Sequence, residues 1–305
     1  MRVCRPDRVG AVRRVVDAKR QWWPRGRIPP REPRPRLRPA GIGLVRTMIT
    51  TALGSCFASE VRLWLEEQGY CVFGVGEGGQ EPPRPLYNAL SIRQEFERAF
   101  GRFEPSEPLW RTRIDGEVIL LDPYRHNAAF GSEATAEAEL REYREELARM
   151  LRQADLVILT IGQAEVWYSR RDGAVYSAIP PADVCDATSD AWRRTTEKEN
   201  AEALTRCLDL LAIEAPGART VLTLSPVPLL ATFQAKEAVA ADMANKRLLR
   251  RAIRRAIRER PGRADYFPSF ELVRSLGRKA WRPDGRHVSA WGVVQVMQAF
   301  ERWAA

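Results

Sequence analysis

Two short motifs, far apart in the sequence, carry residue types that can perform acyl-transfer chemistry. The first, Leu-Gly-Ser-Cys-Phe-Ala, contains two adjacent nucleophiles, Ser55 and Cys56. The second, Asp-Gly-Arg-His, begins with Asp284 and ends with His287. Many hydrolases form a covalent intermediate on a thiol or hydroxyl that an imidazole activates, with a carboxylate orienting the imidazole. Together the two motifs therefore supply a complete candidate set of catalytic groups.

The first motif lies where a strand should end and a helix should begin. Residues 48–53 are typical of a buried strand, and residues 58–68 have the apolar spacing of an amphipathic helix. Cys56 would then occupy the first turn of the helix, where free N–H groups and the helix dipole favour an anion. We expect this position to lower the pKa of the thiol and to offer oxyanion-binding amides beside Cys56 and Phe57. A tight turn around a buried, inert cysteine is the alternative.

The second motif precedes the last helical segment. Ser289 is a suitable N-cap for that helix, so His287 is expected at a loop-to-helix junction, with Asp284 close enough to orient its ring. A surface histidine in a Pro-Asp-Gly turn is the alternative. An Asp-x-x-His spacing is weak evidence by itself, and it gains weight from the Gly-Ser-Cys motif.

Strand-like and helix-like segments alternate between the two motifs. Apolar strand segments are expected at residues 48–53, 70–75, 154–161, 219–224 and 264–267, and helices at 58–68, 92–100, 132–153, 196–213, 238–258 and 289–303. Residues 166–177 have the pattern of a hairpin with an Asp-Gly turn. This alternation predicts an α/β domain of three layers, α/β/α, with a mainly parallel sheet. Ligands of such sheets bind beyond the carboxyl ends of the strands.

Over most of residues 48–305 the sequence resembles the GSCFA family, a branch of the SGNH (GDSL-type) hydrolase superfamily. The matching motifs occur in order at residues 53–58, 87–88, 110 with 122–125, 159–167, 222–228, 266–271 and 284–287. The resemblance implies an SGNH-hydrolase or flavodoxin-like fold. It also implies an esterase or acyltransferase that acts on an acyl ester or thioester, such as an acylated glycan or metabolite, through a covalent acyl-enzyme.

The resemblance also suggests which residue attacks. In the superfamily the first strand ends in Gly-Asp-Ser, with serine as the nucleophile, and a late Asp-x-x-His completes the triad. In this alignment Cys56 takes the place of the nucleophile and Ser55 that of the aspartate, so Cys56 is favoured over Ser55. His287 would act as the base and Asp284 would orient it.

One superfamily block departs from the expected pattern. A Gly-x-Asn-Asp block would fall on residues 162–165, which read Gly-Gln-Ala-Glu, so the oxyanion-binding asparagine is absent. Asn88 or Gln163 is expected to supply the missing donor, with Asn88 slightly favoured, although both could be ordinary loop residues. Gly162 belongs to the same block, and Trp167 is a candidate substrate contact.

The charge of the chain is concentrated in its first 47 residues. Residues 1–47 contain 14 Lys/Arg and 3 Asp/Glu, whereas the whole chain has a net charge of +10, so residues 48–305 are nearly neutral. Seven prolines and mutual repulsion argue against a packed core in this segment. We interpret it as a disordered arm that binds polyanions or lipid, as a linker, or as sequence preceding a native start at Met48. Residues 48–305 are expected to form one catalytic domain.

Other residue types narrow the function further. Five cysteines without CxxC spacing argue against a disulfide framework and favour a reducing cytoplasm. Two histidines in the chain argue against a metal site, and no cofactor is implied. No apolar run is long enough for a membrane span. The neutral domain argues against nucleic-acid binding, and the sequence does not determine an oligomeric state. The main alternative to an enzyme is a catalytically inactive binding module with a basic, polyanion-binding arm.

Overall fold

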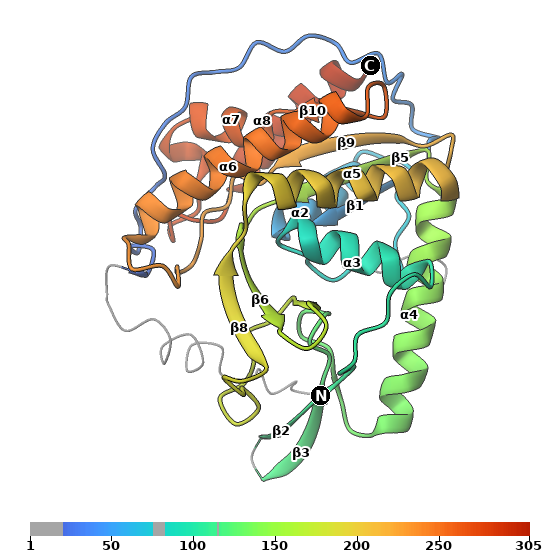
Figure 1. The fold of residues 1–305 in the computed structure, drawn as a ribbon. Helices are drawn as coiled ribbons and strands as arrows, with labels where there is room; N and C mark the ends of the chain where they lie inside the picture. Colours follow the sequence, from blue (N-terminus) through green and yellow to red (C-terminus); the bar gives the residue numbers. More distant parts are fainter. Residues whose placement is uncertain (1–20, 76–82, 115) are drawn as a thin grey trace.

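The computed structural model describes residues 21–75, 83–114 and 116–305 (Figure 1). A four-stranded sheet lies at its centre, in the order β1-β5-β9-β10, and all neighbouring strands are parallel. Its strands are β1 (Thr50–Gly54), β5 (Leu156–Ile161), β9 (Arg219–Leu224) and β10 (Ala264–Phe267). Because all four strands point the same way, their carboxyl ends share one edge, and the loops that follow them can build a single site.

Alternating side chains of the central strand β5 enter two separate cores. Val157, Leu159 and Ile161 pack in one core, and Leu156 and Ile158 pack in the other. Successive side chains of a strand point to opposite faces, so this division requires helices on both sides of the sheet.

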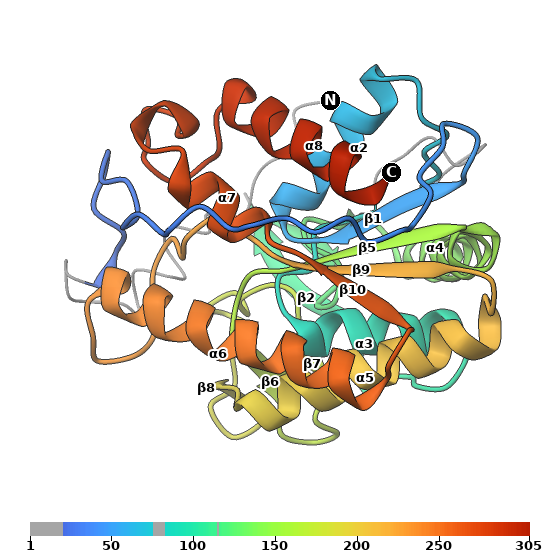
Figure 2. The ribbon, with the colours of Figure 1, turned by 90° about the horizontal axis from the view of Figure 1, so that it is seen from above.

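Helices cover both faces of the sheet, as Figure 2 shows. One face carries α2 (Cys56–Glu67), α7 (Ser269–Ser275) and α8 (Ala290–Ala304). The other carries α3 (Ala89–Ala99), α4 (Glu133–Gln153), α5 (Glu197–Glu214) and α6 (Ala238–Glu259). The short 3-10 helix η3 (Arg278–Ala280) follows α7. The predicted mixed α/β fold, with a parallel sheet between two helical layers, is confirmed.

Two small antiparallel sheets lie beside the central sheet, in the lower part of Figure 1. One has the order β2-β3-β4 and consists of β2 (Trp110–Ile114), β3 (Glu117–Leu121) and β4 (Ala129–Phe130). The other has the order β7-β6-β8 and consists of β6 (Glu165–Ser169), β7 (Val175–Tyr176) and β8 (Asp190–Arg194). The pairing of β6 with β7 confirms the hairpin expected at residues 166–177. The β2–β4 sheet was not anticipated.

Residues 70–75, which we expected to form a strand, contain isolated bridge residues and no strand. One parallel bridge joins Val72 to Thr50. The amide of Thr50 donates to the carbonyl of Cys71, and the amide of Phe73 donates to the carbonyl of Thr50. The prediction of a strand here is wrong, because an apolar, β-branched run does not by itself set the length of the pairing.

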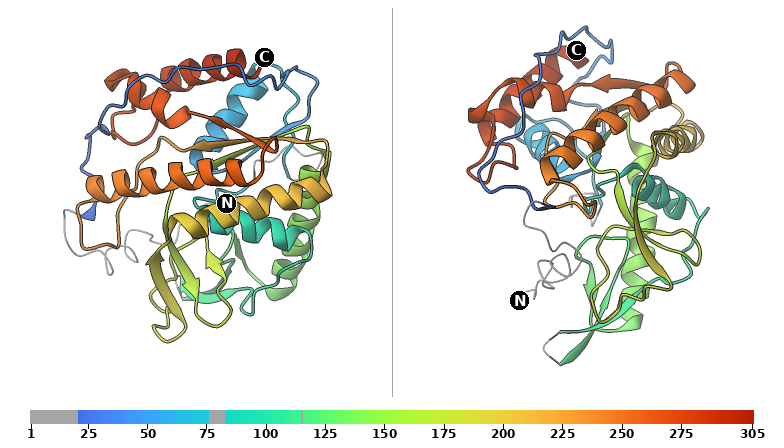
Figure 3. Two further views of the ribbon diagram at one scale, coloured as in Figure 1. Left: turned by 45° about the horizontal axis from the view of Figure 1, so that its top comes forward. Right: turned by 60° about the vertical axis from the view of Figure 1, so that its left-hand side comes forward.

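Residues 21–47, which we call the strap, are extended and packed on the domain (Figures 2 and 3). The amides of Ala40 and Leu44 donate to the carbonyls of Trp303 and Ala304 at the end of α8. Trp23 and Ile42 are 6% and 8% exposed. The strap has no core of its own, as its proline content predicts, but it buries its apolar side chains against the α7–α8 side. The part of the predicted basic arm in residues 1–20 lies outside the described residues.

None of the helices in the described ranges is long and apolar enough to cross a membrane.

Candidate active site

A cavity of about 890 Å³ opens at the carboxyl ends of the central strands. Every residue that the sequence predicted for the site lines it except Asp284, which lies behind His287. The predicted residues in its wall are Ser55, Cys56, Asn88, Gly162, Gln163, Trp167 and His287. The fold thus brings the two distant motifs to one cavity. No hydrogen bond joins His287 to Cys56 or Ser55 in the part of the chain that the structure describes.

The turn that carries Cys56 is fixed by a glycine contact with the neighbouring strand. Gly54 has φ +127, and a Cβ on it would lie 2.1 Å from the carbonyl oxygen of Thr160. The amide of Ser55 donates to the same oxygen, at 3.0 Å. Glycine is therefore required at position 54, both for its backbone conformation and for the close approach of β1 to β5.

Ser55 is the N-cap of α2 and is 2% exposed. Its Oγ accepts a hydrogen bond from the amide of Phe57 at 3.3 Å and lies 3.3 Å from Oγ1 of Thr160. These contacts hold the hydroxyl inside the turn, and they occupy the Phe57 amide that we expected to bind an oxyanion. The geometry gives Ser55 a capping role.

Cys56 is the first residue of α2 and is partly exposed to the cavity. Burial raises the pKa of its thiol above the usual value, although the charges of Arg286 and Lys246 and its own backbone N–H oppose this effect. The expectation of a lowered pKa is wrong, because desolvation at this position outweighs the cations and the helix N-terminus. The thiol is therefore protonated at neutral pH and needs a base.

His287 and Asp284 form a hydrogen-bonded pair. Nδ1 of His287 contacts Oδ2 of Asp284, while Oδ1 accepts the amides of Arg286 and His287 at 2.9 and 3.1 Å. Burial opposes ionisation of the carboxyl, but these hydrogen bonds prevail and lower the pKa of Asp284 to about 2. The carboxylate fixes the ring through Nδ1, which leaves Nε2 as the nitrogen that can take up a proton.

The strap holds the loop that carries this pair. The amide of Gly26 donates to the carbonyl of Asp284 at 3.1 Å. Gly285 has φ +73, and a Cβ on it would lie 2.4 Å from the carbonyl oxygen of Arg27. Trp22, from the same part of the strap, bridges to Ala231 and lines the cavity. The strap therefore belongs to the structure of the site.

The candidate oxyanion donors differ in their availability. The amides of Gly162 and Gln163 both donate to the carbonyl of Tyr87, at 2.9 and 2.8 Å, so neither is free. Asn88 caps α3 through Oδ1, which accepts the amide of Ser91 at 2.8 Å. Its Nδ2 makes no hydrogen bond to any described residue, so the side chains of Asn88 and Gln163 remain candidates.

Lys246 joins two loops that line the cavity, the one after β5 and the one after β9. It lies on α6, is 2% exposed, and donates from Nζ to the carbonyls of Gly162, Ser225 and Val227 at 2.8 to 2.9 Å. Burial lowers the pKa of its ammonium group to about 8. Spacing is the signal that could have found this role, since Asp242 and Lys246 are four residues apart and share a helix face with Leu249.

Arg286 was also missed, although it lies inside the second motif. Its side chain is half-buried and lines the cavity, and its Nη2 donates to the carbonyl of Pro228 at 3.2 Å. Cys56 is the strongest electrostatic neighbour that favours its charged form. A permanent positive charge therefore lies near the thiol.

Aromatic side chains form part of the wall of the cavity. They include Trp22, Trp110, Trp167, Tyr176 and Phe233, and the rings of Trp167 and Phe233 meet edge to face with centroids 5.5 Å apart.

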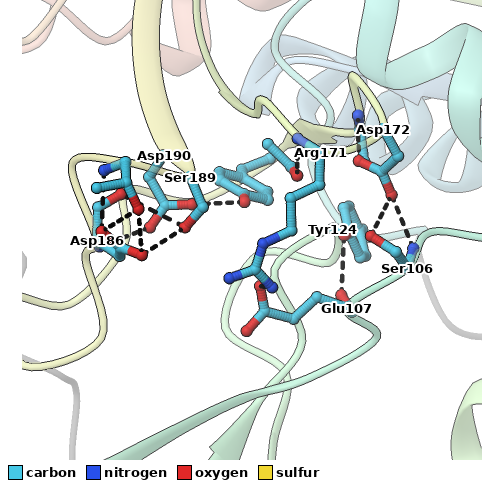
Figure 4. Close-up of polar contacts among 12 residues, drawn as sticks. Ser106, Glu107, Tyr124, Arg171, Asp172, Asp186, Ser189 and Asp190 are labelled. Carbon is cyan, nitrogen blue, oxygen red and sulfur yellow. Dashed lines mark hydrogen bonds and ion pairs between the residues drawn. The ribbon is translucent and has the colours of Figure 1, made fainter.

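Polar contacts fix this wall from behind (Figure 4). The hydroxyl of Tyr176 donates to Asp190 at 2.7 Å, and that of Tyr124 donates to the carbonyl of Glu107 at 2.9 Å. In the same region Asp172 accepts the amide and hydroxyl of Ser106. The wall is thus a fixed apolar surface suited to the non-reacting part of a ligand.

The described residues contain no group of three or more His, Cys, Asp and Glu side chains that could hold a metal ion.

The GSCFA family model matches residues 49–300, so the chain belongs to the GSCFA family. No curated protein matches the chain. Among solved structures, an acetyl xylan esterase (Est2A) from the rumen bacterium Butyrivibrio proteoclasticus is similar at 15% sequence identity, with a TM-score of 0.25. That similarity covers 43% of this chain and 32% of the esterase, so it spans about a third of that protein.

Proposed function

We propose that this protein is an ester hydrolase or acyltransferase that forms a covalent acyl-enzyme on Cys56. The observation that carries the proposal is the presence of Cys56 and the Asp284–His287 pair at one cavity, although they come from the two ends of the matched region. The substrate is an acyl ester or thioester of a metabolite or glycan.

In the first half-reaction, Sγ of Cys56 attacks the carbonyl carbon as Nε2 of His287 takes the thiol proton. The carbonyl oxygen becomes negative in the tetrahedral intermediate, and Asn88 or Gln163 donates to it together with the amide of Cys56. Collapse of the intermediate breaks the bond to the leaving alcohol or thiol, which receives the proton from His287. The product is an S-acyl cysteine.

In the second half-reaction, water or a second hydroxyl attacks the thioester with His287 again as base. The acid or a new ester leaves, and the thiol regains its proton. Asp284 stays ionised throughout because its pKa is about 2, and its charge stabilises the imidazolium that forms in both steps.

The capping role of Ser55 supports Cys56 as the nucleophile. The hydroxyl of Ser55 already accepts a hydrogen bond from the amide of Phe57 and contacts Thr160. Ser55 would have to break these contacts to attack a substrate. The thiol of Cys56 has no such role and borders the cavity.

Intact-mass analysis after incubation with activated acyl esters tests the proposal. Wild type should gain one acyl group, Cys56→Ala should gain none, and His287→Ala should acylate at least about 100-fold more slowly. Cys71→Ala, which removes an exposed thiol, is the control and should behave as wild type. An adduct that survives Cys56→Ala and disappears in Ser55→Ala would make Ser55 the nucleophile. Failure of all acyl esters would favour a binding module instead.

A further inference from the structure

Arg286 differs from the fully buried arginines of this protein. Among the described residues, four arginines are almost completely buried, and each is paired with a carboxylate, in the pairs Arg62–Glu66, Arg98–Glu95, Arg125–Asp122 and Arg274–Asp242. A guanidinium removed from water needs such a counter-charge. Arg286 is half-buried, and no ion pair joins it to a carboxylate of residues 21–75, 83–114 or 116–305.

The acidic groups nearest to Arg286 are already engaged. Asp284 binds His287 and two backbone amides. Asp242 pairs with Arg274 at 2.9 Å and accepts the amide of Leu229 at 3.2 Å. The side chain of Arg286 itself donates once, to Pro228, and its buried Nε has no hydrogen-bond partner among the described residues. The positive charge of Arg286 and most of its N–H donors are therefore available to bind a ligand.

Like Nε of Arg286, other polar atoms in the wall of the cavity are buried without a hydrogen-bond partner among the described residues. Oγ of Ser225, Oγ of Ser177 and Nε1 of Trp167 are buried and lack a partner in the described parts of the protein. All of them can donate a hydrogen bond. The buried carboxylates of this wall are already satisfied. Glu165 accepts hydrogen bonds from Thr232, Phe233, Gln234 and Asn245, and Asp122 accepts from Tyr124 and Arg125. Buried polar groups are normally paired, so these donors indicate a ligand rich in acceptor oxygens.

We infer, on the basis of the proposed function, that the substrate carries a carboxylate close to its scissile ester and that Arg286 binds this carboxylate. Arg286 and Cys56 are close electrostatic neighbours in one cavity, so a carboxylate on the guanidinium places a nearby carbonyl at the thiol. A guanidinium matches the two oxygens of a carboxylate in geometry as well as in charge. The aromatic wall then receives the apolar remainder of the molecule.

The carboxylate can lie on either side of the scissile bond, and two matched pairs of esters separate these cases. On the acyl side, the 4-methylumbelliferyl monoester of adipic acid is compared with 4-methylumbelliferyl hexanoate. On the alcohol side, O-acetylmandelate is compared with its methyl ester. Each pair keeps the reacting ester and changes the neighbouring charge.

We expect wild type to prefer the charged member of at least one pair by about tenfold or more in kcat/KM, as for a hydrogen-bonded ion pair. Arg286→Gln should abolish the preference, and Arg286→Lys should keep part of it. Arg282→Gln is the matched control because Arg282 lies in the same loop, pairs with Glu60 at 2.8 Å and does not line the cavity. It should leave the preference intact.

Three outcomes would overturn the inference: equal rates for charged and neutral esters, a preference that survives Arg286→Gln, or an equal loss for both members of a pair. The last would place Arg286 at the oxyanion. A binding experiment distinguishes a failure of this inference from a failure of the proposed function. Calorimetry on Cys56→Ala protein compares mandelate with mandelamide, and mandelate should bind at least about tenfold more tightly in an Arg286-dependent manner, even if no ester is cleaved. Equal binding of the two compounds would contradict the inference.

Discussion

The two halves of the candidate site are held in place by different means. The turn that carries Cys56 is part of the central sheet, since Gly54 packs on Thr160 and Ser55 is 2% exposed. The loop that carries the acid–base pair lies nearer to solvent, with the side chains of Asp284 and His287 44% and 42% exposed. The core positions Cys56, the proposed nucleophile, whereas a second segment of chain positions His287, the proposed base.

That second segment is the strap. Its Gly26 and Arg27 contact Asp284 and Gly285. The family match begins at residue 49, so the strap lies outside the region that identifies the family. The residues that hold the proposed base therefore lie outside the matched region. We expect the two halves of the site to respond differently to substitution.

The largest expected effect is a loss of stability in the half of the site that carries Cys56. Gly54→Ala would place a methyl group 2.1 Å from the carbonyl oxygen of Thr160 in a backbone conformation that other residues rarely adopt. We expect the free energy of unfolding to fall by at least about 3 kcal/mol, as measured by urea denaturation. Gly101→Ala is the control, because Gly101 has φ +64 and nothing within 4 Å. It should lose about 1 kcal/mol, and equal losses for the two variants would contradict the role given to Gly54.

In the half of the site that carries His287, we expect a smaller loss of stability than for Gly54→Ala and a larger loss of activity. Gly285→Ala would place a methyl group 2.4 Å from the carbonyl oxygen of Arg27 and should displace the loop or the strap. We expect a loss of about 1–3 kcal/mol in stability and acylation at least about tenfold slower. Urea denaturation measures the loss of stability, and intact mass after incubation with an activated acyl ester measures the acylation rate.

The matched control for this change is Gly277→Ala. Gly277 has a similar φ of +74, but the atom nearest to its added Cβ is the flexible end of Arg31, at 2.7 Å. This variant should share the backbone strain and keep its acylation rate. If both variants lost activity equally, the contact between loop and strap would have no special role.

Replacing the N-cap of α2 tests the structural role of Ser55. Ser55→Ala removes the acceptor of the Phe57 amide, and loss of such a cap costs about 1 kcal/mol. The melting temperature should fall by a few degrees, and acylation of Cys56 should persist. Complete loss of acylation with a small change in stability would assign chemistry to Ser55 instead.

The same contrast explains what the sequence could predict. The turn after β1 depends on neighbours in sequence, and its small residues and the helix that follows make it recognisable. The placement of Asp284 and His287 beside the cavity followed from the alternation of strands and helices. The contacts of Gly26 and Arg27 with that loop join residues with no local pattern between them, so composition alone led us to set the strap aside.

The electrostatics of the site could not be read from local position either. The first turn of a helix predicts a lowered thiol pKa for Cys56, but the degree of burial depends on the loops that close the cavity. Lys246 looks like one member of a basic helical run until packing places it under three carbonyl groups. Motif and helix position therefore predicted which candidate residues would line the cavity, but not the burial and charges around them.

The smallest expected effect concerns the charges around Cys56. Burial raises the pKa of the thiol, Arg286 and Lys246 oppose this effect, and Glu60 adds to it. Arg286→Gln removes a cation that favours the thiolate, so the pKa should rise further. The pH profile of Cys56 alkylation should then shift to higher pH, and alkylation at a fixed pH below the midpoint should slow about two- to fivefold. Arg282→Gln, which removes an exposed charge of the same loop, should leave the profile in place. A shift to lower pH in Arg286→Gln would show that the guanidinium affects Cys56 mainly by excluding water rather than by its charge.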